Sequence, residues 1–552
     1  MLTPDELAAI PFFAALSPVA LADVGRAAAD IRLNAGEYAV YEGEPPALFV
    51  VLEGIIEVIK LVDGIERKIG TRLPGKIFGE VPLVFGTQFQ AGFRAGEPTR
   101  VLKLEARPYY AVAASSPELA RSMDEQARER IGGLQKIAAE PPSARVILFG
   151  NRWDGGCLDL RRFLERNQIS FTWLTPDDPN LSDHWPGQPP AESECPALRL
   201  TDGATLIRPE PREFASQLGL QTVPRFEDYD TVIIGGGPAG LAAAVYGASE
   251  GLRAIVVERE APGGQAETSS RIENYLGFPS GISGSELASR ALRQAKRLGA
   301  EILVARKIVR IDPHARRIVF DNEEIIRART VIIASGVSWR RLDIDGFDRL
   351  LGKGIFYGAA RSEAAVAQGL DVHLIGAGNS AGQAAIFFSN YARTVTLIVR
   401  AKSLEKSMST YLIDQIRNKS NIRAALRSEV KAVHGDSHLT AIEIIDRSTN
   451  EVRREDSGGL FVFIGADAET GWLPPEIARD PRGYILTGGD VVKAGSWKES
   501  RDPYLVETSV PGVFACGDVR FSPVKRVASA VGEGSIAIAF VHQYLADRAK
   551  PG

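Results

Sequence analysis

The stretch Thr231–Glu260, TVIIGGGPAGLAAAVYGASEGLRAIVVERE, decides the fold of this chain. An apolar run leads into a glycine-rich turn, an alanine-rich segment follows, and a second apolar run ends on Glu258, 258 − 235 = 23 positions after the first glycine of the turn. This order predicts a strand, a helix and a second strand. An acidic residue at the end of the second strand is placed to accept a hydrogen bond from a ribose hydroxyl, so the stretch predicts a dinucleotide-binding βαβ unit.

The glycine-rich turn itself predicts how a dinucleotide is held. Gly235 allows the tight turn, Gly237 lets a pyrophosphate approach the backbone, and Gly240 lets the helix pack closely on the strand. Pro238 and Ala239 begin the helix, whose first turn offers unpaired N–H groups to the phosphate. Because the strand, the helix and the terminal acid are all in place, the motif indicates a nucleotide site rather than a purely structural turn.

The composition limits the class of protein. A chain of 552 residues is long enough for about three or four domains. Its net charge of −4 gives no indication of a nucleic-acid or anionic-membrane partner, and the N-terminus lacks a basic segment followed by a long apolar core. We therefore expect a cytoplasmic protein. The three cysteines, Cys157, Cys195 and Cys516, are too widely spaced for a disulfide framework, a CxxC pair or a cysteine-rich metal site.

Residues 1–140 alternate short β-type runs with glycine turns, and helical patterns flank them at both ends. This pattern predicts a β-roll with helices. The segment resembles the cyclic-nucleotide-binding domain of the catabolite activator protein family in three motifs: AGEYAVYEGEPP (35–46), FVVLEGIIEVIK (49–60) and GKIFGEVPLVFGTQFQAGFRA (75–95). No helix-turn-helix pattern follows, so a transcription factor is not indicated.

The resemblance implies a binding site that is altered in this chain. Gly79 and Glu80 occupy the positions that hold the ribose hydroxyl of a cyclic nucleotide in the family, whereas Phe89 replaces the arginine that pairs with the cyclic phosphate. A phosphate without a cationic partner loses its strongest contact. Arg94 could replace that arginine only if the loop were rearranged. Two interpretations stay open, a site for cyclic AMP or cyclic GMP and a regulatory module with an altered pocket.

Residues 144–222 predict a strand, a helix, a second strand, a hairpin and a last helix. This order resembles a thioredoxin or glutaredoxin domain. Trp153-Asp154-Gly155-Gly156-Cys157 aligns with the WCGPC motif of that family, and Cys195-Pro196 with its cis-proline loop. Asp154 stands where the family has the attacking thiolate, and a carboxylate cannot exchange with a disulfide. The segment is therefore either a redox-inert adaptor or carries a redox pair of Cys157 and Cys195, which the resemblance places close together.

Further stretches after Glu258 resemble the low-molecular-weight thioredoxin reductases: Gly263–Gln265, Ile272–Gly277, Ile332–Gly336 and VPGVFACGDVRFSPVKRVASAVGEG (510–534). The resemblance implies a homodimer and a discontinuous FAD domain, residues 226–345 and 465–546. In it Asp518 would bind the ribityl chain, and a helix starting near Val527 would face the pyrimidine end of the flavin. The candidate FAD-binding residues are Gly235, Gly237, Pro238, Ala239, Gly240, Glu258, Gly264, Gln265, Asn274, Gly517, Asp518, Arg526, Val527 and Ala528.

A second glycine motif, Gly376-Ala377-Gly378-Asn379-Ser380-Ala381, lies in residues 346–464 and predicts a second βαβ unit, which binds a nicotinamide cofactor. Its second strand ends at Arg400, 400 − 376 = 24 positions after the first glycine. An arginine there can pair with the 2′-phosphate of NADPH, whereas NAD sites normally have an acid. Lys402 and Lys406 can support it where the resembled family has further arginines. NADPH is the expected cofactor, with NADH as the alternative.

Thioredoxin reductases carry a CATCDG motif just before this glycine motif, and its cysteines receive electrons from the flavin. This chain has GIFYGAARSE, residues 354–363, at that place, so Gly358 and Arg361 replace the cysteines and Ser362 replaces the acid. A flavin-to-dithiol relay cannot operate there. Arg361 is a candidate modulator of the flavin, and Cys516, which follows an apolar run, is expected to pack beneath the cofactor.

The whole sequence predicts an α/β protein with two Rossmann-like domains, for FAD and NAD(P)H, preceded by a cyclic-nucleotide-binding-like β-roll and a thioredoxin-like domain. The predicted function is an NAD(P)H oxidoreductase whose flavin delivers electrons directly to a small-molecule or protein acceptor, under regulation by a nucleotide. One alternative is a sensor in which flavin redox state or nucleotide occupancy controls a partner protein. The other is a disulfide reductase that uses Cys157 and Cys195.

Overall fold

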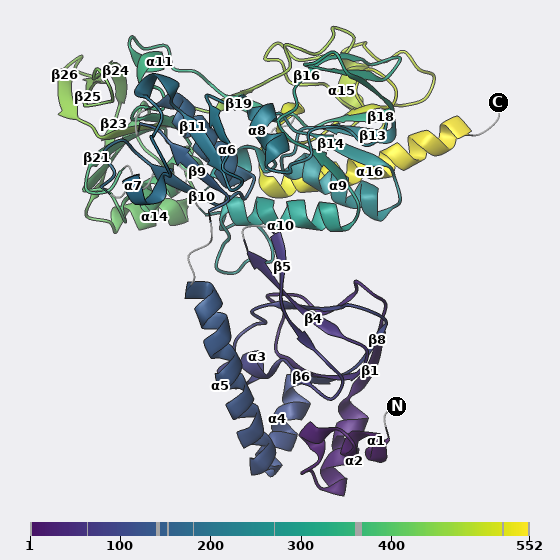
Figure 1. Cartoon of the computed structure of the whole chain (residues 1–552). Coiled ribbons are helices and arrows are strands. Elements are labelled where there is room, and N and C mark those ends of the chain that lie inside the picture. Colours follow the sequence, from purple (N-terminus) through teal and green to yellow (C-terminus); the bar gives the residue numbers. More distant parts are fainter. Residues whose placement is uncertain are drawn as a thin grey trace. The chain divides into compact units, whose positions relative to one another are not determined.

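Figure 1 shows the computed structural model of the chain. It describes residues 3–62, 65–139, 144–151, 154–179, 181–269, 271–358, 367–521 and 524–549. The chain forms two compact units, Met1–Ala144 and Arg145–Gly552. Within the described residues, every helix is too short or too polar to cross a lipid bilayer.

The first unit is a β-roll of two four-stranded antiparallel sheets. One sheet has the order β1-β8-β3-β6 (Ala29–Leu33, Thr99–Glu105, Ala47–Glu53 and Ile77–Phe78), and the other has the order β2-β7-β4-β5 (Tyr38–Val40, Gly92–Ala95, Ile56–Val62 and Ile65–Arg72). The helices are α1 (Pro4–Ala8), η1 (Pro11–Phe13), α2 (Pro18–Ala27), α3 (Glu80–Phe85), α4 (Ala106–Ser115) and α5 (Pro117–Ala139). The predicted β-roll with helices at both ends is confirmed.

Aromatic side chains fill this roll. Phe49 in β3 stacks on Phe78 in β6 with ring centroids 4.7 Å apart, and Phe78 stacks on Phe93 in β7 at 4.5 Å. Phe89 is only 2% exposed, and its ring meets those of Phe49 and Phe93 edge-on. The residue that stands at the phosphate-binding arginine position is therefore part of the aromatic core.

The second unit begins with a four-stranded mixed sheet of order β10-β9-β11-β12. β9 (Val146–Phe149) is parallel to β10 (Phe171–Leu174), and β11 (Ala197–Leu200) is antiparallel to β9 and to β12 (Thr205–Ile207). The helices are α6 (Gly155–Arg166), α7 (Leu181–His184), η2 (Glu192–Glu194) and α8 (Pro211–Gln217). The predicted order of elements is confirmed, and the Cys195–Pro196 peptide bond is cis. The likeness to thioredoxins stays an interpretation of this topology.

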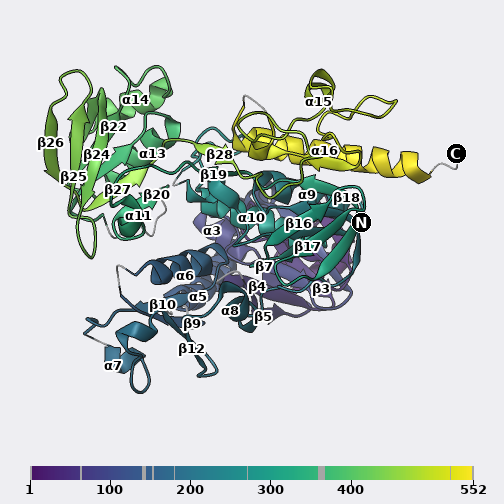
Figure 2. The same cartoon turned by 90° about the horizontal axis from the view of Figure 1, so that it is seen from above.

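A seven-stranded sheet carries the first glycine-rich turn. Its order is β15-β14-β13-β18-β17-β16, and β29 pairs with β18 (Glu301–Leu303, Ala254–Val257, Asp228–Ile234, Ile325–Ile333, Arg317–Phe320, Ile308–Asp312 and Val513–Ala515). The sheet is built from two separate stretches of the chain, because β29 comes from the C-terminal part. α9 (Pro238–Ser249) connects β13 to β14, and α16 (Val527–Ala549) runs alongside it in both views (Figures 1 and 2).

A five-stranded parallel sheet carries the second glycine-rich turn, with the order β20-β27-β21-β22-β23 (Ile355–Tyr357, Gly459–Val462, Asp371–Ile375, Thr394–Val399 and Ile422–Leu426). A smaller antiparallel sheet follows, β24-β25-β26 (Ser428–His434, Ala441–Asp446 and Val452–Asp456). The remaining elements are η3 (Gly264–Thr268), α10 (Gly284–Arg297), α11 (Phe347–Leu350), α13 (Asn379–Phe388), α14 (Thr410–Arg417), α15 (Gly489–Lys493), η4 (Gly517–Val519) and the strand pair β19 (Val337–Trp339) and β28 (Ala466–Ala468). Both glycine motifs lie in βαβ units, and the α/β fold class is confirmed.

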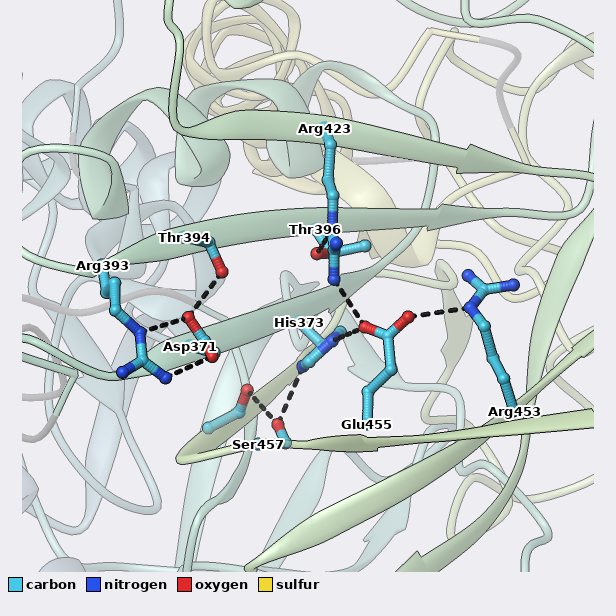
Figure 3. A network of polar contacts seen from close by, with 10 residues as sticks. Asp371, His373, Arg393, Thr394, Thr396, Arg423, Arg453, Glu455 and Ser457 are labelled. Carbon is cyan, nitrogen blue, oxygen red and sulfur yellow. Dashed lines mark hydrogen bonds and ion pairs between the residues drawn. The ribbon is translucent and has the colours of Figure 1, made fainter.

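A polar network joins the five-stranded parallel sheet to the antiparallel sheet β24-β25-β26 (Figure 3). The buried His373 of β21 contacts Ser457 Oγ at 2.9 Å and Glu455 Oε2 at 3.0 Å, and Glu455 pairs with Arg423 of β23 at 2.6 Å. Asp371, at the first residue of β21, binds Arg393 and Thr394. Since the glycine-rich turn follows the other end of β21, this network holds sheets together and lies away from the candidate nucleotide site.

Candidate dinucleotide-binding sites

The first glycine-rich turn leaves no room for side chains at two positions. Gly235 has φ +105°, and a Cβ there would lie 3.0 Å from the Cα of Ser335. A Cβ at Gly240 would overlap the carbonyl oxygen of Gly235, so α9 packs directly against the turn. The hydroxyl of Ser335 is buried and forms no hydrogen bond with the described residues. An unpaired buried hydroxyl beside the turn fits a site that a polar ligand completes.

The start of α9 is open by comparison. Gly237 caps the helix in an extended conformation, and the nearest atom to a Cβ placed there is the Cα of Gly264, at 3.8 Å. Gly264 itself has φ +59°, and its own Cβ position would lie 2.9 Å from the Cα of Gly237. The structure therefore brings these two predicted residues together across a gap that only glycines leave open.

Glu258 lies at the edge of this turn and is buried. Its Oε2 accepts a hydrogen bond from the N–H of Gly236 at 2.7 Å, and its Oε1 accepts one from the N–H of Glu260 at 3.0 Å. Burial raises the pKa of the carboxyl, and the two N–H donors act against that rise. Each oxygen keeps a further lone pair, so the carboxylate can still accept from a hydroxyl.

The loop before α16 meets the first turn of α9. A Cβ on Gly517, which has φ +74°, would lie 2.8 Å from the Cβ of Ala239, and a Cβ on Gly534 would overlap the Ala239 carbonyl oxygen. This packing holds Gly517, the residue before Asp518, against the first turn of α9. The Asp518 carboxyl is partly buried, which raises its pKa, and it forms no hydrogen bond with the described residues. Its free oxygens fit a site for ligand hydroxyls.

Two residues that sequence reasoning missed hold this loop. Lys525 Nζ donates to the carbonyl oxygen of Asp518 at 2.7 Å and to that of Arg520 at 3.0 Å. Glu533 Oε2, on α16, accepts from the N–H of Gly517 at 2.7 Å. Neither residue follows a spacing rule that could have singled it out, because both act on backbone groups brought near by folding.

The other candidate FAD-binding residues are spread more widely. Gln265 Nε2 donates to the Val337 carbonyl oxygen at 2.6 Å, so its amide is engaged with the protein. Asn274 is exposed in the loop between Ile272 and Ile282, away from a defined helix or strand. At the start of α16, Val527 is partly buried, whereas the side chains on either side of it are exposed; these are Arg526 and Ala528.

The second glycine-rich turn is more open than the first. Gly376 has φ +147°, and its Cβ position is 2.6 Å from the Phe463 carbonyl oxygen, so a glycine is needed there. No described atom lies within 4 Å of a Cβ placed on Gly378, the residue that caps α13. The Asn379 side chain accepts from the N–H of Ser409 at 2.8 Å. Ser380 is exposed and Ala381 is buried against the sheet.

Two exposed cationic side chains follow the end of β22. Arg400 and Lys402 are exposed, and neither forms an ion pair or a hydrogen bond with the described residues. Glu405, which stands where the resembled family has an arginine, pairs with Arg417 at 2.8 Å. The negative charge of Glu405 is thereby partly neutralised, and the free cations can receive an anionic group.

The thiol site of residues 145–222 is closed. Asp154 Oδ1 accepts from the N–H of Cys157 at 2.8 Å, so this aspartate is the N-cap of α6. Cys157 and Cys195 both border Gly150, and both are buried. Burial raises the pKa of each thiol, and Asp154 raises it further. The expected proximity is observed, but protonated thiols are poor nucleophiles toward disulfides.

The position of the first missing cysteine, Gly358, lies beside η3. Gly358 is buried with φ +91°, and a Cβ there would lie 3.4 Å from the side chain of Thr268 in η3. Arg361 and Ser362 lie outside the described residues. Cys516 follows β29 and is fully buried in the core with residues of α9 and α16, and burial raises its pKa. Its place beneath the cofactor stays a prediction.

Arg166 at the end of α6 links residues 145–222 to the segment that follows β14. Its Nη1 pairs with Glu260 at 2.8 Å, its Nη2 donates to the Ala261 carbonyl oxygen at 2.8 Å, and its Nε pairs with Glu267. Burial raises the pKa of Glu267 to about 7. Sequence reasoning missed this link, because an arginine near a helix end is usually a solvated residue.

The first unit contains a cavity of about 250 Å³ that Gly79, Glu80 and Phe89 help to line. Gly79 has φ +93° and precedes α3, whose first residue is the buried Glu80. Arg94 pairs with Glu57 at 3.0 Å and Glu66 at 2.8 Å, so it does not replace the missing arginine. The two predicted residues therefore share a cavity in which the family's phosphate partner is absent.

The comparisons with known proteins agree with this organisation. A family model described as "Pyridine nucleotide-disulphide oxidoreductase" matches residues 229–534, more than half of the chain, and one described as "Cyclic nucleotide-binding domain" matches residues 30–116. The chain is 32% identical over 317 residues to the "34.2 kDa protein in rubredoxin operon" of Clostridium pasteurianum, which covers 57% of this chain and 97% of that protein.

Two further similarities point the same way. The chain is 32% identical over 322 residues to the "Bifunctional thioredoxin reductase/thioredoxin" of Mycobacterium leprae, with 58% of this chain and 67% of that protein covered. The crystal structure of T. acidophilum thioredoxin reductase matches with a TM-score of 0.52 at 30% identity, and the match covers 59% of this chain and 100% of that one.

Proposed function

Because the chain belongs to the pyridine nucleotide-disulphide oxidoreductase family, we propose that it is an enzyme that oxidises NADPH through FAD and delivers the electrons to an acceptor without a thiol pair of its own. Thioredoxin-reductase-like members of this family use FAD and NADPH. The observation that carries the proposal is the stretch before the second glycine-rich turn, where Gly358 and Arg361 stand in place of the two redox cysteines.

The remaining cysteines support this proposal. Cys516 is fully buried in the core, and Cys157 and Cys195 are buried thiols with raised pKa values beside the Asp154 cap. None of them offers an exposed thiolate. The electrons must therefore leave from the flavin itself, toward a small-molecule or protein acceptor.

The geometry of the first turn supports the proposed FAD-binding residues. FAD supplies a hydride acceptor when it is bound. Gly237 and the first turn of α9 would hold the pyrophosphate of FAD, Glu258 the ribose and Asp518 the ribityl chain. The start of α16, at Val527, would lie toward the pyrimidine end of a bound flavin, where the partial positive charge of the helix N-terminus would stabilise negative charge.

The residues for the nicotinamide cofactor follow from the second turn. The first turn of α13 and the open face of Gly378 would hold the pyrophosphate. Arg400 pairs with the 2′-phosphate and Lys402 supports it, which favours NADPH over NADH. The assembly as a homodimer and the cytoplasmic location stay predictions from the sequence.

Steady-state turnover tests the proposal. The protein mixed with NADPH and ferricyanide should give sustained oxidation of NADPH, because ferricyanide takes electrons directly from a flavin. DTNB, which requires an attacking thiol, should not be reduced. A single stoichiometric bleaching of the flavin without turnover would instead favour the sensor, and DTNB reduction would favour the disulfide reductase.

The first unit regulates this activity when it binds a ligand. Its match to the cyclic-nucleotide-binding family and its cavity of about 250 Å³ support a small effector. Measuring NADPH–ferricyanide turnover with and without cyclic AMP and cyclic GMP tests a cyclic nucleotide as that effector.

A further inference from the structure

The cavity of the first unit carries an uncompensated positive charge. Three charged side chains line it: Arg72 at the end of β5, Glu80 at the start of α3 and Arg130 on α5. Arg130 Nη1 lies 2.8 Å from Glu80 Oε2, so the only carboxylate of the lining is already paired. The same nitrogen donates its hydrogen bond to the Ile77 carbonyl oxygen at 2.9 Å, which ties α5 to β6.

Arg72 is the cation that stays without a counter-ion. It forms no ion pair with the described residues, its Nη1 donates only to the carbonyl oxygen of its neighbour Thr71 at 3.0 Å, and its Nε is buried without a partner. Burial lowers the pKa of the guanidinium and Arg130 lowers it further, while the carboxylate of Glu80, which is paired with Arg130, acts against this shift. A partly desolvated cation of this kind is stabilised when an anion enters beside it.

The rest of the lining is apolar and aromatic. Phe89 and Phe93 meet edge-on with ring centroids 5.7 Å apart, and Val58 and Ile69 lie on neighbouring strands of the roll. Such a surface favours a flat ring. The volume of about 250 Å³ is below the roughly 300–1,000 Å³ that pockets for drug-sized ligands occupy, so the occupant is small.

We propose that this cavity binds a small organic anion, whose charged group pairs with Arg72 and whose ring lies against Phe89 and Phe93. The family's phosphate position is blocked, since Phe89 stands there and Arg94 is held by two glutamates. The charge is therefore received at β5. This inference deepens the regulatory part of the proposed function and rests on it only for the effect on turnover.

Isothermal titration of the full-length protein tests the charge requirement with two probes of the same shape. 1-Naphthylacetate is an anion, and 1-naphthylacetamide is its neutral counterpart. We expect saturable binding of the acetate, about tenfold or more tighter than the amide, because a charge-assisted hydrogen bond is worth more than a neutral one. Equal affinity for the two probes, or no saturable heat with the acetate at millimolar concentration, would overturn the proposal.

Matched variants locate the charge. Arg72→Gln should abolish the preference for the acetate, and Arg72→Lys should keep part of it. Arg67→Gln, an exposed arginine on the same strand, should leave the preference intact. A preference that survives Arg72→Gln in a variant with unchanged thermal midpoint would refute the role of Arg72.

Cyclic AMP and cyclic GMP are titrated as competitors. Displacement of the acetate by a cyclic nucleotide that also depends on Arg72 would identify the source of the same anionic chemistry, whereas cyclic-nucleotide binding that ignores Arg72 would contradict the proposal. These titrations use no turnover, so their failure leaves the flavin chemistry standing, and a failure of ferricyanide turnover leaves the binding result standing.

Discussion

The two glycine-rich turns of this chain share a βαβ template but differ in how closely the helix approaches the turn. On the flavin side, α9 packs so tightly that a Cβ at Gly240 would overlap the carbonyl oxygen of Gly235. At the corresponding position of the second turn the chain has Ala381, and its side chain is accommodated in the core. The first motif therefore admits only glycine at this position, whereas the second has room for the methyl group of an alanine.

The residues at the strand ends also make the first turn closed and the second turn open. Glu258 is buried and holds two backbone N–H groups, whereas Arg400 is exposed and has no partner among the described residues. Gly264 closes over Gly237, but nothing in the described structure lies within 4 Å of a Cβ at Gly378. A closed turn suits a resident cofactor, and an open one suits a co-substrate that enters and leaves in each cycle.

The largest expected effect comes from breaking the closed turn. Gly240→Val places a branched side chain against the turn, so we expect protein that lacks FAD or does not fold. The matched change Ala381→Gly should keep FAD and cost about 0.5–1 kcal/mol of helix stability. Flavin absorbance and the thermal midpoint of the two purified variants are the measurements. A Gly240→Val protein with full flavin content would contradict the close packing.

The open turn should show itself in cofactor preference. Arg400→Gln removes a charge-assisted contact to the 2′-phosphate, so the KM for NADPH should rise about 10–100-fold, while the KM for NADH changes little. Lys431→Gln, an exposed lysine on β24, serves as the control and should change neither value. Equal increases for both cofactors would show that Arg400 acts on the fold rather than on the phosphate.

A smaller effect should be a pH dependence of the unfolding free energy that arises from His373 in the five-stranded sheet. Burial lowers the pKa of His373 below its usual 6.5, with Glu455 opposing and Arg423 adding to that shift. The folded state thus disfavours the protonated ring. The stabilisation is complete above pH 6.5 and is lost as the pH falls through the folded-state pKa, at about 1.4 kcal/mol of unfolding free energy per unit of pKa lowering.

Urea unfolding of the wild type and of His373→Gln at several pH values between about 5 and 8 measures this. The wild type should lose stability as the pH falls across this range, and the variant should show a flatter profile. Parallel profiles would mean that another group causes the dependence.

The smallest expected effect concerns the thiols of the first segment of the second unit. Ser replacement of both Cys157 and Cys195 removes two buried, protonated thiols, so NADPH–ferricyanide turnover should stay within about twofold of the wild type. Loss of turnover in a variant that retains its FAD and its thermal midpoint would show that electrons pass through this pair. The flavin would then not be the last redox centre.

The sequence alone determined the local units. Glycine spacing, apolar runs and the residue at each strand end predicted both βαβ units, because these signals act over one turn, one helix and two strands. The absence of the cysteine pair before the second glycine motif, where Gly358 and Arg361 stand, is likewise a matter of residue identity. Asp154 precedes a predicted helix, which is a common place for an N-cap aspartate, but only the structure showed it in that role.

Only the tertiary structure decided which distant side chains meet. Arg72 and Arg130 lie on a strand and a helix far apart in sequence, yet they face one cavity, and only one of them is paired. Arg166 reaches Glu267, and Lys525 reaches the backbone of Asp518, through contacts that follow no fixed spacing. Whether an exposed-looking charge is solvated or bound depends on packing between elements, and packing is a property of the folded chain.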